Sequence, residues 1–312
     1  MWSDLLNLGI IVSVLAATIR IATPVLFSAL GEVTAERAGV YNMGIEGTML
    51  MGAFIGWLAT YESGSSLIGL AAALLAGAVM SLIFAVMVIS LKIDQIVTGL
   101  ALNLLGSGLS TYWLRAAFSN MEKVPGITVL RTWPVPFLSD IPVVGPVLFN
   151  QGALTYLAFL LVPVIWLFLF RSRLGLEIRC IGENPKALDI KGHSVAARQY
   201  AAVIFGGAMA GLGGACLTIA STAHFVPDMV NGRGWLALVI VIAGGWRPGW
   251  ILAAALFFSF LDALQLQIQG VGIAIPYQIL LALPYIAAIV ALMIRRRASR
   301  APAMLGVSYR RE

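Results

Sequence analysis

Charged residues are scarce in this sequence, at 11% of 312 residues, whereas a soluble domain has roughly 25%. Hydrophobic residues make up 60% of the chain. A chain of this composition has too few polar side chains to cover a folded core in water, so a soluble globule is excluded. We therefore expect the chain to lie in a lipid bilayer.

Cysteine and histidine are nearly missing, with two of each. Cys180 lies in a basic loop and Cys216 inside an apolar run, so no disulfide is expected, and no spacing suggests a metal site. His193 and His224 lie in different predicted loops, and no span carries paired carboxylates. The sequence predicts neither an enzyme nor a bound cofactor.

A phosphate-binding loop of the form Gly-x-x-x-x-Gly-Lys-Ser/Thr is also missing. The chain is therefore not expected to cradle ATP phosphates itself in the usual way. The net charge of +6 does not indicate nucleic acid binding, because the basic residues sit beside apolar runs rather than in an aromatic-interleaved patch. We expect these residues to set membrane topology.

Long apolar runs dominate instead, and several, such as 67–91 and 199–222, are long enough to cross about 30 Å of hydrocarbon as a helix. The run 154–170 is apolar on every side, whereas strands of a membrane barrel alternate apolar and polar residues. We predict an all-α, polytopic membrane helical bundle of about eight to nine spans, one or two of them broken, with 1–312 as a single transmembrane domain. The expected spans are 5–30, 43–60, 67–91, 95–114, 152–170, 199–222, 234–245, 249–268 and 276–294.

Two dense basic clusters indicate the topology. Six Lys or Arg residues lie in the loop 171–198 and six in the tail 295–312. The positive-inside rule places both clusters in the cytoplasm, and the even number of predicted spans between them makes the two assignments agree. The C-terminus is thus expected inside. The longest external connection, 115–151, contains five prolines that break any long helix, so we expect an ordered or partly re-entrant cap.

Two segments interrupt the helical pattern. The apolar piece between Arg233 and Arg247 is too short to cross at about 1.5 Å per residue, so a half-helix is expected. The segment 39–47 places three glycines with Asn42 and Glu46 at the start of an apolar span. Irregular backbone at membrane depth is tolerated only where protein or a water-filled cavity surrounds it. Two interruptions in one bundle therefore point to a central pathway.

Polar side chains within the apolar spans are candidates for this pathway, because polar groups in hydrocarbon are costly without partners. Hydrogen bonding between helices is an equally good interpretation for any single one of them, and Glu46 alternatively lies among lipid headgroups. Gln265 and Gln269 are four residues apart and share a face that suits an uncharged polar solute. The predicted pathway residues are Asn42, Glu46, Asn103, Trp235, Asp262, Gln265 and Gln269.

A short helix is expected in the basic loop after the fifth span. Asn184 can cap its start, Pro185 suits the first helical position and Gly192 suits the position just past its end. A capped helix in a connecting loop is suited to contact with another protein. The alternative is an inert solvated turn.

Three motifs carry a resemblance to a known family. They are Glu-Arg-Ala-Gly-Val-Tyr-Asn-Met-Gly-Ile-Glu-Gly at 36–47, Gly-Glu-Asn-Pro at 182–185, and Pro284-Tyr285 followed by the basic tail. Over nearly its whole length the chain resembles bacterial ABC-importer permeases. Within the class that includes simple-sugar and branched-chain amino-acid permeases, it is most similar to the nucleoside group. The first motif is fairly specific to that group, and the loop motif is shared more widely.

The resemblance implies a permease subunit of an ATP-driven ABC importer in the bacterial cytoplasmic membrane. Its implied partners are a cytoplasmic ABC ATPase, a second permease that is expected to be a paralogue, and an extracellular or periplasmic substrate-binding protein. The short loop helix then corresponds to the coupling helix that docks on the ATPase. The coupling residues that the resemblance implies are Glu183, Asn184, Pro185, Lys186, Asp189 and Lys191.

The substrate and the energy source leave alternatives. A secondary transporter would need ion-coordinating or proton-relay residues deep in the membrane, and the chain offers few beyond Asp262 and Arg20. An amino-acid substrate would favour formal charges in the cavity, whereas the middle spans carry mainly amides, Trp235 and Trp246. Nucleosides, with a ring that can stack, are therefore expected, and a simple sugar or branched-chain amino acid is the alternative.

Overall fold

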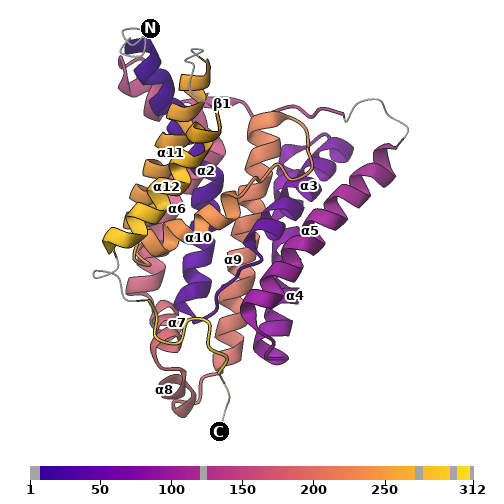
Figure 1. The fold of residues 1–312 in the computed structure, drawn as a ribbon, viewed down its shortest axis with the longest axis vertical. Helices are drawn as coiled ribbons and strands as arrows, with labels where there is room; N and C mark the ends of the chain where they lie inside the picture. Colours follow the sequence, from indigo (N-terminus) through magenta and orange to yellow (C-terminus); the bar gives the residue numbers. More distant parts are fainter. Residues whose placement is uncertain (1–7, 120–124, 271–276, 296–300, 310–312) are drawn as a thin grey trace.

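A computed structural model describes residues 8–119, 125–270, 277–295 and 301–309, and these residues form an almost entirely helical bundle (Figure 1). All nine expected segments are helical, although residues 5–7 of the first and residue 276 of the last lie outside the described residues. The helices are α2 (Leu8–Arg37), α3 (Ile45–Ser63), α4 (Ser66–Ala85) with η1 (Val86–Ser90), α5 (Gln95–Phe118), α6 (Ala153–Arg171), α9 (Val195–Leu217) with η3 (Thr218–Thr222), α10 (Arg233–Ala243), α11 (Pro248–Gly270) and α12 (Tyr277–Arg295).

Helix length and composition support a membrane location. Five helices in the described residues are long and apolar enough to cross a bilayer: α2, α4 with η1, α6, α9 with η3, and α11. The remaining long helices, α3, α5 and α12, have 19, 24 and 19 residues. The short helix α10 has 11 residues, as expected for a half-helix. The predicted all-α, multi-pass membrane bundle is confirmed.

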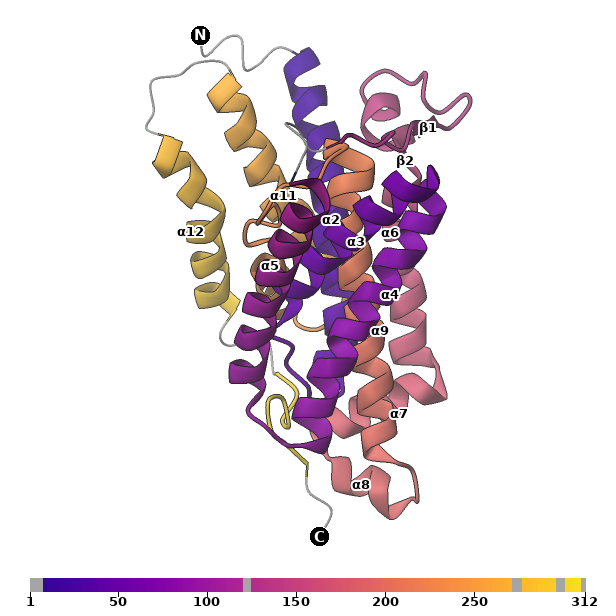
Figure 2. The same cartoon turned by 90° about the vertical axis from the view of Figure 1, so that its right-hand side faces the viewer.

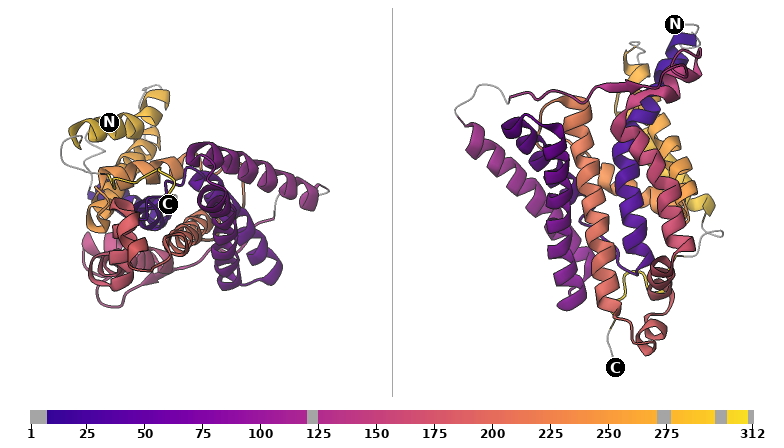
Figure 3. Two further views of the ribbon diagram at one scale, coloured as in Figure 1. Left: turned by 90° about the horizontal axis from the view of Figure 1, so that it is seen from below. Right: turned by 180° about the vertical axis from the view of Figure 1, so that it is seen from behind.

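The most buried of the five spanning helices is α9, which lies between two groups of helices (Figures 1 and 3). Helices α3, α4 and α5 lie on one side of it, and α2, α6, α11 and α12 on the other. Glycines allow this central position, because a Cβ atom added to Gly207 would lie 2.5 Å from the carbonyl oxygen of Gly77 in α4. A Cβ atom added to Gly211 would lie 3.0 Å from the Cα atom of the same glycine. The Gly-xxx-Gly spacing of Gly207 and Gly211 thus lets the backbones of α9 and α4 approach closely.

The connection after α5 crosses the end of the bundle at which α2 begins (Figure 2). Its described part contains β1 (Thr132–Pro134), η2 (Gly145–Phe149) and β2 (Asn150–Gly152), and the two strands pair antiparallel. Backbone hydrogen bonds from Ile127 N to Ala223 O (2.7 Å) and from Leu130 N to Ile219 O (2.9 Å) attach it to the end of α9. The expected ordered cap is present in this part of the chain.

The opposite end carries α7 (Arg173–Glu183), α8 (Pro185–Ile190) and the C-terminal residues 301–309 (Figure 1). Helix α8 is the expected short loop helix, and Gly192 follows it with a φ of +81°, as predicted for its end. Asn184 occupies the capping position, but its side chain makes no capping hydrogen bond, so that detail was wrong. The preceding helix α7 was not predicted.

Replacing Gly211 with Ala should destabilise the bundle, because the added methyl group meets the backbone of α4 in a packed core. Overpacking of this kind costs about 1–3 kcal/mol. The matched control is Gly108→Ala on α5, where an added Cβ atom meets nothing within 4 Å. Thermal unfolding of the detergent-purified chain should show a lower midpoint for Gly211→Ala alone. Equal midpoints in the two variants would show that the α4–α9 contact tolerates a side chain.

Candidate functional site

The first interruption is the irregular segment 38–44 between α2 and α3. Its first three backbone N–H groups donate to carbonyls at the end of α2, and three later ones donate to side chains, because irregular backbone inside a membrane protein needs such partners. Tyr41 N donates to Gln95 Oε1 (2.7 Å) and Asn42 N donates to Glu32 Oε1 (3.0 Å). The Asn42 side chain in turn accepts from Gly44 N (3.0 Å).

Helix α5 braces this segment along two turns. Asn103 accepts a hydrogen bond from Gly47 N (2.8 Å) and donates one to Met43 O (2.8 Å). Gln95 and Asn103 are separated by about 12 Å along α5 at a helical rise of about 1.5 Å per residue. The segment 38–44 therefore runs alongside α5 from the end of α2 into the bundle, and α3 begins inside the bundle.

The second interruption precedes α10, whose N-terminus meets the N-terminus of α3. Gly232 N and Gly234 N donate to Glu46 Oε1 and Oε2, each at 2.7 Å. The first N–H groups of a helix have no partner within the helix, and its N-terminus carries a partial positive charge. The carboxylate of Glu46 supplies both the acceptors and the opposite charge.

The far end of α10 is held by the last residues of α2. The indole N–H of Trp246 donates to the carboxylate of Glu36, which is fully buried. Trp246 O accepts hydrogen bonds from Arg37 Nε (3.2 Å) and Nη2 (2.9 Å). A cation is favourable here because the C-terminal end of a helix carries a partial negative charge. We refer to Glu36, Arg37 and Glu46, with their partners at the two ends of α10, as the clamp.

A cavity of about 150 Å³ adjoins the N-terminal end of α10. Its polar lining comes from Asn231, Arg233, Asp262 and Gln265, which provide donors, acceptors and charges of both signs. Gly232, Leu236, Leu266 and Pro284 complete the wall. Because ligand pockets typically measure about 300–1,000 Å³, a solute of nucleoside or sugar size requires these helices to separate.

The seven predicted pathway residues fall in three places. Asp262 and Gln265 line the cavity. Asn42, Glu46 and Asn103 have their side chains hydrogen-bonded to backbone at the interruptions, which is the interpretation left open from the sequence. The side chains of the remaining two do not line the cavity, because Trp235 packs against the main core and Gln269 is exposed.

Sequence reasoning missed several residues of this site. Arg37 was interpreted only as a topology charge, and the buried carboxylates Glu32 and Glu36 received no role. The structure shows that α2 continues past the predicted end at residue 30 and carries both carboxylates into the bundle. Two carboxylates four residues apart on an apolar helix were the signal, because ionisable groups in membrane helices need partners.

Comparison with known proteins identifies the family. The family model described as "Branched-chain amino acid transport system / permease component" matches residues 14–294. The chain is 40% identical to the putative glucose ABC transporter permease protein TsgC13 of Haloferax volcanii, over 84% of this chain and 79% of that protein. It is 35% identical to the guanosine ABC transporter permease protein NupQ of Bacillus subtilis, over 95% and 96%.

It is also 33% identical to the nucleoside ABC transporter permease protein NupC of Lactococcus lactis subsp. cremoris, over 92% of this chain and 93% of that protein. No solved structure matches. A family match over most of the chain agrees with the helical membrane bundle and its two interruptions. The chain belongs to this family of multi-pass permease subunits of ABC transporters.

Proposed function

We propose that this ABC permease carries nucleosides. The observation that carries the proposal is near-full-length similarity to permeases named for guanosine and for nucleosides. The motif at 36–47, which resembles the nucleoside group, supplies all three clamp residues, Glu36, Arg37 and Glu46. The motif that carries the resemblance therefore contains the residues that form the clamp.

A simple sugar is the second candidate, favoured by the more identical but shorter match to the putative glucose permease. The argument against an amino acid is weaker than the sequence suggested, because Arg233 and Asp262 place formal charges on the cavity wall. Charges of both signs fit the two ends of an amino acid as well as the polar edges of a base. The nucleoside proposal thus depends on the relatives and not on the cavity's charge.

Among the predicted pathway residues, Asp262 and Gln265 are proposed to meet the solute. Asn42, Glu46 and Asn103 are proposed to hold the interrupted helices that border the route. Trp235 and Gln269 lie away from the cavity in this conformation, and we propose that they contact solute only if the bundle rearranges.

The whole chain is proposed to act as one transmembrane domain in the bacterial cytoplasmic membrane. The basic loop 171–198 forms the end that carries α7 and α8, where residues 301–309 also lie, so this end is proposed to face the cytoplasm together with the C-terminus. ATP hydrolysis is assigned to a separate ATPase subunit. A substrate-binding protein and a second, paralogous permease complete the proposed assembly.

Helix α8 is proposed to dock on the ATPase. It buries Pro185 and Leu188 against the chain and exposes Ile190, which is 86% exposed. Glu183, Asn184, Lys186 and Lys191, in and beside the same helix, have exposed polar side chains. An apolar centre with a polar rim is the usual anatomy of a protein interface. Ile190 was not among the coupling residues predicted from the sequence.

Uptake of labelled guanosine, glucose and leucine into proteoliposomes that contain the complete importer tests the substrate. Guanosine should be taken up in an ATP-dependent manner, and the other two should neither enter nor compete. Glucose or leucine uptake without guanosine uptake would contradict the nucleoside proposal.

The same assay tests the cavity. Gln265→Leu keeps the side chain's size but removes its amide, and guanosine uptake at low concentration should fall about tenfold, the equivalent of one lost hydrogen bond. Gln267→Leu, two residues along α11 and outside the cavity wall, is the matched control and should transport normally. If guanosine uptake falls equally in both variants, or falls in neither, the solute does not pass this cavity.

Ile190→Ser should weaken binding of the ATPase about tenfold or more, because burial of an Ile side chain contributes about 1.5–3 kcal/mol. Ile190→Leu keeps the apolar contact and should behave like the wild type. The measurement is the amount of ATPase retained on the immobilised permease as its concentration is lowered. Full retention by Ile190→Ser would argue against α8 as the docking helix.

A further inference from the structure

The C-terminal residues 301–309 contact three separate parts of the chain that the proposed transport cycle has to connect. Met304 N donates to Gly182 O at the end of α7 (2.8 Å). Gly306 N donates to Gly39 O in the first interruption (3.1 Å). The hydroxyl of Tyr309 donates to Asp189 Oδ2 on α8 (3.0 Å).

We propose that residues 301–309, which we call the strap, transmit movement of α8 to the interrupted helices. This inference rests on the proposed function, in which α8 docks on the ATPase. Tyr309 is then a positioning residue that holds α8 to the strap. The strap is the middle part of the C-terminal tail 295–312, for which the sequence predicted only a topological role.

Close packing makes the strap part of the bundle. Gly39 has a φ of +80°, and a Cβ atom added there would lie 3.1 Å from Met304 O. A Cβ atom added to Gly182 would lie 3.2 Å from Pro302 Cβ, and Pro302 is buried. Leu305 packs against the main hydrophobic core. Movement of the strap cannot therefore leave the segment 38–44 in place.

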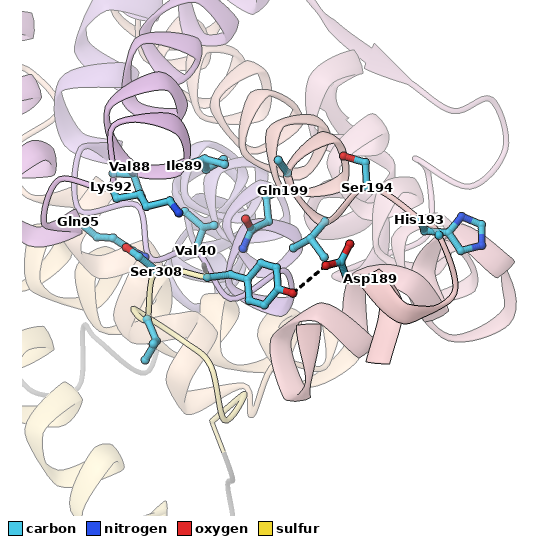
Figure 4. A pocket seen from close by; sticks show the side chains of 15 residues that line it. Val40, Val88, Ile89, Lys92, Gln95, Asp189, His193, Ser194, Gln199 and Ser308 are labelled. Carbon is cyan, nitrogen blue, oxygen red and sulfur yellow. Dashed lines mark hydrogen bonds between the residues drawn. The ribbon is translucent and has the colours of Figure 1, made fainter. Parts of the chain in front are cut away.

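The far end of the strap meets α8 beside a hollow and not within a solid core. The Tyr309 ring packs against the small cluster of Ile181, Leu188 and Val195. Next to it lies a cavity of about 350 Å³ whose wall includes Asp189, Lys92 and Gln199 (Figure 4). An empty space of this size gives α8 room to shift without compressing packed side chains. The bond between Tyr309 and Asp189 would carry such a shift to the strap.

The segment that receives the movement leads directly to both ends of α10. On one side of Gly39 lie Glu36 and Arg37, which bind Trp246 at the end of α10. On the other side lies Glu46, which binds the N-terminus of α10. A displacement of the strap at Gly39 therefore acts on the whole clamp.

Tyr309→Phe tests the inference because it removes the hydroxyl and keeps the packed ring. In the complete importer in proteoliposomes, this variant should retain its ATPase, and guanosine transported per ATP hydrolysed should fall about threefold or more. Hydrogen exchange of residues 231–243, measured with and without ATP, should show an ATP-dependent change that shrinks by a similar factor. Ser308→Ala removes the neighbouring hydroxyl on the same cavity and should leave both readouts unchanged.

Asp189→Ala removes the acceptor from the other side and should reproduce the loss, whereas Asp189→Asn keeps an acceptor oxygen and should restore most of it. Wild-type ratios in both Tyr309→Phe and Asp189→Ala would overturn the strap. Loss of the ATPase in Tyr309→Phe would also overturn it, because the segment would then dock the partner. If Ile190→Ser detaches the ATPase while Tyr309→Phe transports normally, only the proposed role of the strap is contradicted. If Ile190→Ser has no effect on ATPase binding, the proposed docking role of α8 is contradicted as well.

Discussion

The carboxylate of Glu46 links the N-termini of α3 and α10, and both helices begin at an interruption inside the bundle. A helix that begins inside a membrane bundle exposes N–H groups that cost several kcal/mol each if they stay unpaired. In this chain the start of α10 places Gly232 and Gly234 against Glu46, next to the start of α3. Glu36 and Arg37, on the other side of the same interruption, hold the opposite end of α10. Each interruption thus supplies the partners that the other needs.

This arrangement links the cavity to the end of the molecule where energy would enter. The cavity adjoins the held N-terminus of α10, so it can enlarge only if α10, α11 or α12 moves. The route from α8 reaches α10 through the strap and the interruption at Gly39, without passing through the buried centre of α9. Packed glycines on α9 keep that centre close to α2, α3 and α4. The bundle thus combines a closely packed middle at α9 with the short helix α10, which the clamp holds at its two ends.

Much of the architecture could be predicted from the sequence, because long apolar runs and glycine-rich interruptions have few structural solutions. The half-helix α10 and the irregular segment before α3 were both expected. What the sequence could not give was their pairing, because Glu46 and Gly232 are distant in the chain and meet only in the fold. Asn103 was predicted as a pathway residue, and its side chain bonds the backbone of Met43 and Gly47. These partners are also distant in the chain, so the sequence could not show them. The contacts of residues 301–309 could not be predicted either, because backbone hydrogen bonds leave no trace in residue identity.

Hydrogen exchange at Gly232 and Gly234 in the absence of ATP tests the pairing most directly. Glu46→Ala should speed exchange of these two amides about tenfold or more, because a hydrogen bond to a charged group contributes about 1.5–3 kcal/mol. Glu62→Ala, at the exposed end of the same helix, should leave both rates unchanged. If the Glu46→Ala amides exchange at the wild-type rate, the two interrupted helices do not depend on each other, and the clamp is contradicted.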